Sequence, residues 1–98
     1  MKIVISEIIT IPNGAPATIA SLLSAIPANV KRLTLQPIGG DVAIGPQGMV
    51  YATSFKLVAN SVDDNDVGTR AGQNEIELDG IYVDGNAGGI TMNVMAWD

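Results

Sequence analysis

ITMNVMA, residues 90–96, is the stretch of sequence that decides the fold. Its side chains alternate between an apolar set and a mixed set, Ile90, Met92, Val94 and Ala96 against Thr91, Asn93 and Met95. Successive side chains of a β-strand point to opposite faces of a sheet, so this pattern predicts a strand with one buried face. The preceding GNAGG, residues 85–89, predicts a flexible loop that leads into the strand.

Short stretches of the same kind follow one another from residue 30 to residue 84. We predict strands over residues 30–36, 41–45, 49–53, 55–59, 75–79 and 81–84. The side chains predicted to face inward are Leu33, Leu35, Val42, Ile44, Ile76, Leu78, Ile81 and Val83. Turn-forming residues predict breaks at 37–40 and 46–48 and a polar loop over 60–73. This spacing predicts a mainly β fold, an antiparallel β-sandwich or a jelly-roll-like barrel.

The N-terminal stretch IVISEIITI, residues 3–11, is rich in the β-branched residues that favour strands. Both faces of this predicted strand are partly apolar: Ile3, Ile5, Ile9 and Ile11 share one face with Glu7, and Val4 and Ile8 share the other with Ser6 and Thr10. We therefore expect the strand to be covered on both sides, in part by a neighbouring subunit. The turn residues PNG, 12–14, end it.

Residues 15–26, APATIASLLSAI, predict one short N-terminal helix. Its apolar stripe consists of Ile19, Leu22, Leu23 and Ile26, at the spacing of one helix face that packs on a sheet. Pro16 suits the first turn of a helix, and Pro27 ends it. The opposite face carries only Ala, Ser and Thr, and two interpretations stay open: a contact surface for another protein, or a plain surface of small residues.

The composition favours assembly. Charged residues make up 15% of the 98-residue chain and hydrophobic residues 47%, whereas a typical soluble domain has about 25% charged residues. We expect a single domain, residues 1–98, that buries apolar surface between copies of itself as a homo-oligomer. The alternative is a monomer whose surface is made of Ser, Thr, Asn and Gly.

The residue types present argue against several classes of function. The chain has no histidine and no cysteine, and these residues supply most general acid–base groups and transition-metal ligands, so we expect neither an enzyme nor a cofactor. Its five basic residues are scattered and its net charge is −5, which argues against nucleic-acid binding. The sequence has no run of about eighteen apolar residues, so it predicts no membrane span. We expect synthesis and folding in the cytoplasm.

Two acidic stretches are candidate sites. Residues 63–68, DDNDVG, place Asp64, Asp66 and Gly68 at the alternate positions of a calcium loop, with Glu75 at its twelfth position. Thr69 stands where that loop needs glycine, so we interpret the stretch as a solvated loop and predict no metal site. Glu75, Glu77 and Asp79 share one face of a predicted strand, and paired carboxylates act as acid and base in glycosidases. Because few aromatic residues are present to line a sugar cleft, we interpret them as a solvated strand face.

Three segments carry a resemblance to a known class of protein. They are PANVKRLTLQ at 27–36, a leader into a strand, GDVAIG at 40–45, a second short strand, and GIYVDGNAGG at 80–89, a strand followed by a loop of small residues. In kind and order they resemble small β-sandwich proteins encoded beside phage capsid and tail genes, including head-decoration (cement) proteins. The resemblance covers roughly residues 27–95. It implies a virion component without an active site, often a trimer, on the capsid or the tail.

The leading hypothesis is therefore a virion protein that decorates and stabilises the phage capsid shell as a homo-oligomer, with a trimer favoured and a major capsid or tail protein as partner. The predicted contact residues are Ile3, Ile5, Ile9, Thr18, Ser21 and Trp97. For Trp97 the other interpretation is a cap over the open end of the sandwich. The alternative function is a receptor- or carbohydrate-binding module of a phage tail, whose candidate contacts are Tyr51, Tyr82 and Trp97.

Overall fold

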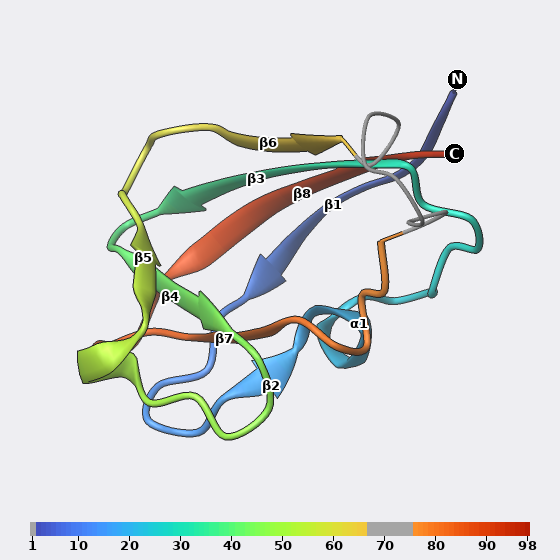
Figure 1. The fold of residues 1–98 in the computed structure, drawn as a ribbon. Helices are drawn as coiled ribbons and strands as arrows, with labels where there is room; N and C mark the ends of the chain where they lie inside the picture. The colour runs from blue at the N-terminus through green and yellow to red at the C-terminus, as the bar shows by residue number, and fades with distance from the viewer. Residues whose placement is uncertain (1, 67–75) are drawn as a thin grey trace.

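Two four-stranded antiparallel sheets face each other in the computed structural model, which describes residues 2–66 and 76–98 (Figure 1). The first sheet has the order β1 (Ile3–Thr10), β8 (Thr91–Trp97), β3 (Arg32–Ile38) and β6 (Asp63–Asp66). The second has the order β2 (Ala17–Thr18), β7 (Tyr82–Asp84), β4 (Val42–Gly45) and β5 (Phe55–Leu57). A four-residue helix, α1 (Ile19–Leu22), and one 3₁₀ turn, η1 (Tyr51–Thr53), complete the elements. The predicted β-sandwich is confirmed.

β8 lies in the middle of the first sheet because both of its edges are paired. It pairs with β1 on one side and with β3 on the other, over its whole length. The apolar set predicted from the sequence is buried, namely Ile90, Met92, Val94 and Ala96. The other set, Thr91, Asn93 and Met95, lies half-buried on the outer face of the sheet. The alternation along residues 90–96 thus sets the inner and outer faces of this sheet.

The core is formed by side chains of both sheets and of α1. Leu33 and Leu35 of β3, Val42 of β4 and Val83 of β7 are buried as predicted, and so is Ile19 of α1. Of the other residues predicted to face inward, Leu78 is buried and Ile44, Ile76 and Ile81 are partly buried against the core. Burial of such side chains is the main stabilising contribution in a domain of this size.

The predicted helix over residues 15–26 is wrong in its bounds, because α1 covers only Ile19–Leu22. Before it, Ala17 and Thr18 pair with β7 as strand β2. The hydroxyl oxygen of Thr18 accepts the N–H of Ser21 at 3.2 Å, which begins the helix with an N-cap. Leu23 already has an extended backbone. Ser24 then donates its N–H to the carboxylate of Glu7 on β1. Hydrogen bonds to β7 before α1 and to Glu7 after it therefore take the place of further helical hydrogen bonds.

As a consequence, the predicted apolar stripe is only partly correct. Ile19 and Leu23 are buried and Leu22 is partly buried, whereas Ile26 is 68% exposed.

Pro37 lies inside β3, although its neighbourhood predicts a turn. Pro37 is buried and stands opposite Met92 of β8. Its carbonyl accepts the N–H of Asn60 at 2.7 Å, on the side of β6. The N–H and C=O of a strand residue point toward the same neighbouring strand. The N–H that proline lacks would therefore also point toward the side of β6. Because β6 pairs only with residues 32–35 of β3, no hydrogen bond between the strands is lost at Pro37.

Three further strand predictions need correction. Residues 49–53 form a turn and η1 rather than a strand, since Thr53 donates its N–H to the carbonyl of Val50. Residues 63–66, predicted as loop, form β6. Residues 76–79 belong to no strand, and Glu75 lies outside the described residues. Ile76 and Leu78 still face inward, because individual backbone hydrogen bonds hold this segment in place of strand pairing. The N–H of Ile76 donates to the carbonyl of Val30 at 2.7 Å, and the carbonyl of Leu78 accepts the N–H of Ala20 at 3.1 Å.

In the described part of the chain, the helical segments are too short to span a lipid bilayer.

Leu35→Ala tests the core of the sandwich. Leu35 is fully buried in the middle of β3, so the substitution removes buried carbons and leaves a cavity. We expect the free energy of unfolding to fall by about 2–5 kcal/mol, measured by chemical denaturation. Ile38→Ala is the matched control at the exposed end of the same strand, and its loss should be clearly smaller. Equal losses would contradict the assigned faces of β3.

Candidate functional site

One long strand edge of the sandwich is open. β1 is the terminal strand of the first sheet, and among the described residues no strand pairs with its outer side. β1 has eight residues, whereas the other edge strands β6, β2 and β5 have four, two and three. An open edge presents unpaired N–H and C=O groups that can bind a strand of another chain. β1 is therefore the strongest candidate for a contact surface in the part of the chain that the structure describes.

The pairing register identifies the open backbone groups of β1. Ile11 donates its N–H to the carbonyl of Ile90 at 2.9 Å, in the register that runs on from Thr10 back to Ile5. Antiparallel partners are hydrogen-bonded only at every second pair. The odd-numbered residues therefore bond to β8. The groups that point away from β8 are those of Ser6, Ile8 and Thr10.

This open stretch has a defined end on each side. Toward the N-terminus, a register shift between Ile3 and Ile5 breaks the alternation, as a β-bulge does. Toward the C-terminus, Pro12 has no N–H, and its carbonyl already accepts the N–H of Gly85 at 2.8 Å. The stretch available for regular pairing therefore runs from Ser6 to Thr10.

On the outer face of the first sheet, the side chains beside this open stretch are uncharged. Ile8 is 67% exposed there and Ile3 53% exposed. An open groove crosses the same face; its lining includes Ser6, Ile8, Asn93 and Met95, and Glu7 is its one charged residue. Protein interfaces are depleted in charge at their centre and combine apolar with uncharged polar groups. The outer face of β1 and β8 has this character.

Glu7 occupies the inner side of β1, between Ile5 and Ile9. Its carboxylate accepts hydrogen bonds from the backbone N–H of Ser24 at 3.0 Å and from the Ser24 hydroxyl at 3.0 Å. These bonds give a half-buried charge its partners. They also hold the segment that follows α1 against β1. The inner side of the open strand is thus occupied by the chain itself.

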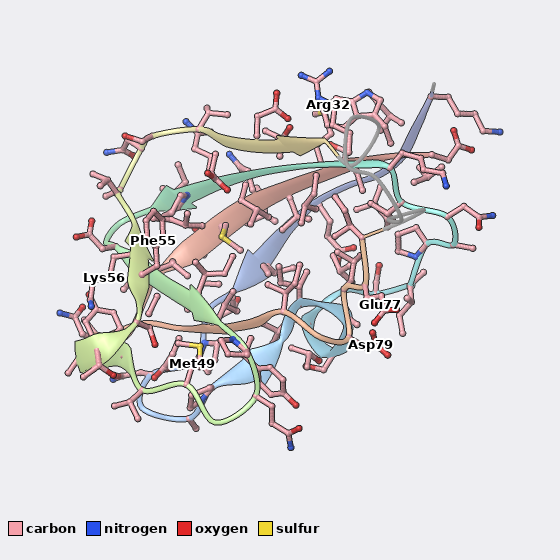
Figure 2. All side chains as sticks on the ribbon, viewed as in Figure 1. Arg32, Met49, Phe55, Lys56, Glu77 and Asp79 are labelled. Carbon is pink, nitrogen blue, oxygen red and sulfur yellow. The ribbon has the colours of Figure 1, made fainter. Side chains whose placement is uncertain are left out.

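Arg32 and Asp64 form an ion pair on the outer face of the same sheet. The Arg32 Nε donates to Asp64 Oδ1 at 2.9 Å, and its guanidinium lies 4.9 Å from the ring centroid of Trp97. The hydrogen bond from Arg32 is the main cause that lowers the pKa of Asp64; desolvation opposes it, while the Thr34 hydroxyl and the charge of Arg32 assist. Trp97 therefore packs against a cation of its own chain. Figure 2 shows Arg32 at the end of the sheet where both termini lie.

The acidic stretch 63–66 forms strand β6. Neighbouring strand residues point to opposite faces, which separates Asp63 from Asp64, and Asp64 is bound to Arg32. The remaining positions of the calcium pattern, Val67, Gly68, Thr69 and Glu75, lie outside the described residues. Within the residues that are described, no three acidic side chains form a group that could hold a metal ion. The expected absence of a metal site stays a prediction.

Glu77 and Asp79 are exposed near α1 (Figure 2). They line an open groove together with Ile26, Pro27, Ala28 and Asn29. Leu78 between them is buried, so the alternation predicted for this stretch holds although the strand does not. The third acid of the predicted face, Glu75, is outside the described residues.

The six predicted contact residues lie in different environments. Ile9 is 2% exposed and belongs to the core, so the single chain does not present it to a partner. Ile5 is partly buried against the core, and Thr18 caps α1. Ile3 and Ser21 are exposed, and Trp97 is half-buried beside Arg32. As a set they are not brought together; Ile3, Ile5 and Ile9 share β1, and Trp97 lies opposite Ile3.

Sequence reasoning missed two of the most exposed apolar side chains, Ile8 and Phe55. Phe55 of β5 is 73% exposed, and Figure 2 shows it beside Lys56 at the edge of the second sheet. The signal for Ile8 was present, because it alternates with Ser6 and Thr10, which predicts the solvent-facing side. Phe55 carried no such signal, since it shares its strand face with the buried Leu57.

Comparison with protein-family models, with characterised proteins and with solved structures finds no match.

Asp64→Asn tests the ion pair through its pH dependence. Because the folded-state pKa of Asp64 is lowered, its stabilising contribution is fully present above the unfolded-state value and is lost as the pH falls through the lower folded-state value. We expect wild type to melt at a higher temperature than the variant at pH 5–7, and the difference to shrink below the ordinary pKa of 3.8.

Asp79→Asn removes the same charge from an exposed residue and serves as the control for the change in net charge. A difference between wild type and Asp64→Asn that stays constant down to pH 2 would contradict this role of the carboxylate.

Proposed function

We propose that this chain is a structural protein of a phage particle, a capsid decoration (cement) protein that binds and stabilises the shell. The observation that carries the proposal is the open stretch of β1 with exposed, uncharged side chains beside it. Such an edge is a liability in a free protein and a binding element in an assembly. The resemblance of residues 27–95 to small virion proteins supports the same class.

The mechanism is stabilisation by mass action. A protein that binds the assembled shell, and not its separated subunits, shifts the equilibrium toward the shell by an amount that depends on its concentration and affinity. Backbone hydrogen bonds along β1 give such a contact direction and register. Exposed apolar side chains such as Ile8 add buried area. Neither contribution requires a catalytic group.

The titratable groups of the described residues support a binding role over an enzymatic one. Glu7, Asp64 and Asp84 each accept hydrogen bonds that hold parts of the fold together. The chain has no histidine or cysteine to act as a base or a nucleophile near neutral pH. We therefore propose no reaction, no cofactor and no nucleic-acid or membrane partner.

The proposed partners are further copies of the chain and a major capsid or tail protein. The resemblance implies a trimer, made in the host cytoplasm and located in the virion, whereas the open edge of β1 favours a pair of copies. The low proportion of charged residues, 15%, supports burial of further surface between subunits.

The alternative, a receptor- or carbohydrate-binding module of the tail, has less support. Its candidate rings Tyr51, Tyr82 and Trp97 are all half-buried. Lys56 already lies over Tyr51 at 4.7 Å from the ring centroid, as Arg32 lies over Trp97. Neither of the two grooves described above has an aromatic residue in its lining. Sugar rings generally stack on open aromatic faces, which these arrangements do not offer.

The direct test is whether the chain is part of a virion. Particles of the phage that encodes it are purified on a density gradient, and the chain is quantified by mass spectrometry against the major capsid protein. We expect a fixed ratio to capsid, and faster loss of DNA on heating from particles that lack the chain. Intact particles without the chain would contradict the proposal. Recovery in isolated tails alone would support the alternative.

A further inference from the structure

We propose that the open stretch of β1 pairs with β1 of a second copy of this chain, antiparallel about a twofold axis at Ile8. This inference rests on the proposed assembly function and names the occupant of its edge. Three residues offer open backbone groups, Ser6, Ile8 and Thr10, as the register requires. With the axis at Ile8, Ser6 stands opposite Thr10 of the partner and Ile8 opposite itself. All three open residues are then paired in each copy.

The neighbouring registers are worse for physical reasons. An axis at Glu7 places two carboxylate-bearing residues directly opposite each other, which is destabilising. It also brings Thr10 opposite Val4, within the register shift between Ile3 and Ile5. An axis at Ile9 places Ser6 opposite Pro12, which has no N–H to donate. The axis at Ile8 avoids each of these defects.

Charge supports a second copy as the occupant of β1. The net charge of −5 opposes contact between most surfaces of two copies. The other terminal strand of this sheet, β6, has the acidic sequence DDND, and its Asp64 is already bound to Arg32. The open residues of β1 are uncharged, and its one acid, Glu7, is bound to Ser24 on the inner side. β1 is thus the edge along which two copies meet without like charges opposed.

The pairing has a consequence for the shell contact. It joins the two first sheets into one continuous sheet, with the two β1 strands at its centre and β8 next to each. The outward side chains of these central strands include Ile8, Asn93 and Met95, and none of those on β1 or β8 is charged. The paired chains therefore present a neutral face that is twice as wide as that of one chain.

The first test is the mass of the purified chain in solution, measured by light scattering at about 100 µM and below. We expect twice the chain mass of 10.1 kDa. Ile8→Lys places two like charges opposite each other at the axis, and it should weaken the dimer by roughly a hundredfold or more. Ile26→Lys is the matched control, because Ile26 is 68% exposed and Ile8 67%, and it should remain a dimer. Circular dichroism and thermal melting verify that both variants fold.

A monomeric wild type would overturn the inference, and so would a dimer that Ile8→Lys leaves intact. A trimer would overturn it as well, because three copies require a head-to-tail contact, such as β1 against β6, and no twofold axis.

A second arm tests the register with single-cysteine variants, since the chain has no cysteine. Hydrogen-bonded antiparallel partners have Cα atoms about 5.5 Å apart, within the roughly 4.4–6.8 Å of disulfides. Under copper-phenanthroline oxidation, Ile8→Cys should therefore cross-link to itself much faster than Ile26→Cys. Equal rates would overturn the axis at Ile8.

The outcomes separate this inference from the proposed function. A chain that dimerises through Ile8 but is absent from virions contradicts the virion function alone. A chain that is present in virions but monomeric in solution contradicts the pairing alone.

Discussion

The double pairing of β8, with β1 on one side and β3 on the other, is the constraint on which the rest of the structure depends. Its register buries Met92, Val94 and Ala96 against the second sheet. Because adjacent strands share faces, the same register places Leu33 and Leu35 of β3 in the core. It also decides which backbone groups of β1 are used inside the sheet and which stay open. The candidate interface is thus a direct result of how one central strand is paired.

Several charged groups of the described residues hold parts of the fold together, and none lies on the outer face of β1 or β8. Asp84 is 3% exposed, and its carboxylate accepts the N–H of Gly14 at 3.0 Å, which joins two loops at one end of the sandwich. Glu7 fastens the segment after α1 at the edge, and Arg32 is held between Asp64 and Trp97. Charges in these positions stabilise local structure, and a neutral surface suited to another protein remains beside the open edge.

Much of the fold follows from alternation in the sequence, because a strand with one buried face has a period of two. This is why the inward residues of β3, β7 and β8 could be predicted. The bounds of α1 and the position of Pro37 could not, since both depend on partners distant in sequence. The faces of β1 were also ambiguous. Both faces carry isoleucine, and Glu7 lies on the face of Ile9. The bond to Ser24 lets that face turn inward, and Ile8 is left exposed.

Amide hydrogen exchange along β1, followed by NMR at several protein concentrations, shows directly whether the open edge pairs with a second copy. The amides of Glu7 and Ile9, which bond to β8, should be protected at every concentration. Those of Ser6, Ile8 and Thr10 should be protected only at concentrations where the chain pairs with its copy. Fast exchange at these three residues at all concentrations would contradict the account, because the open edge would then have no partner in a second copy.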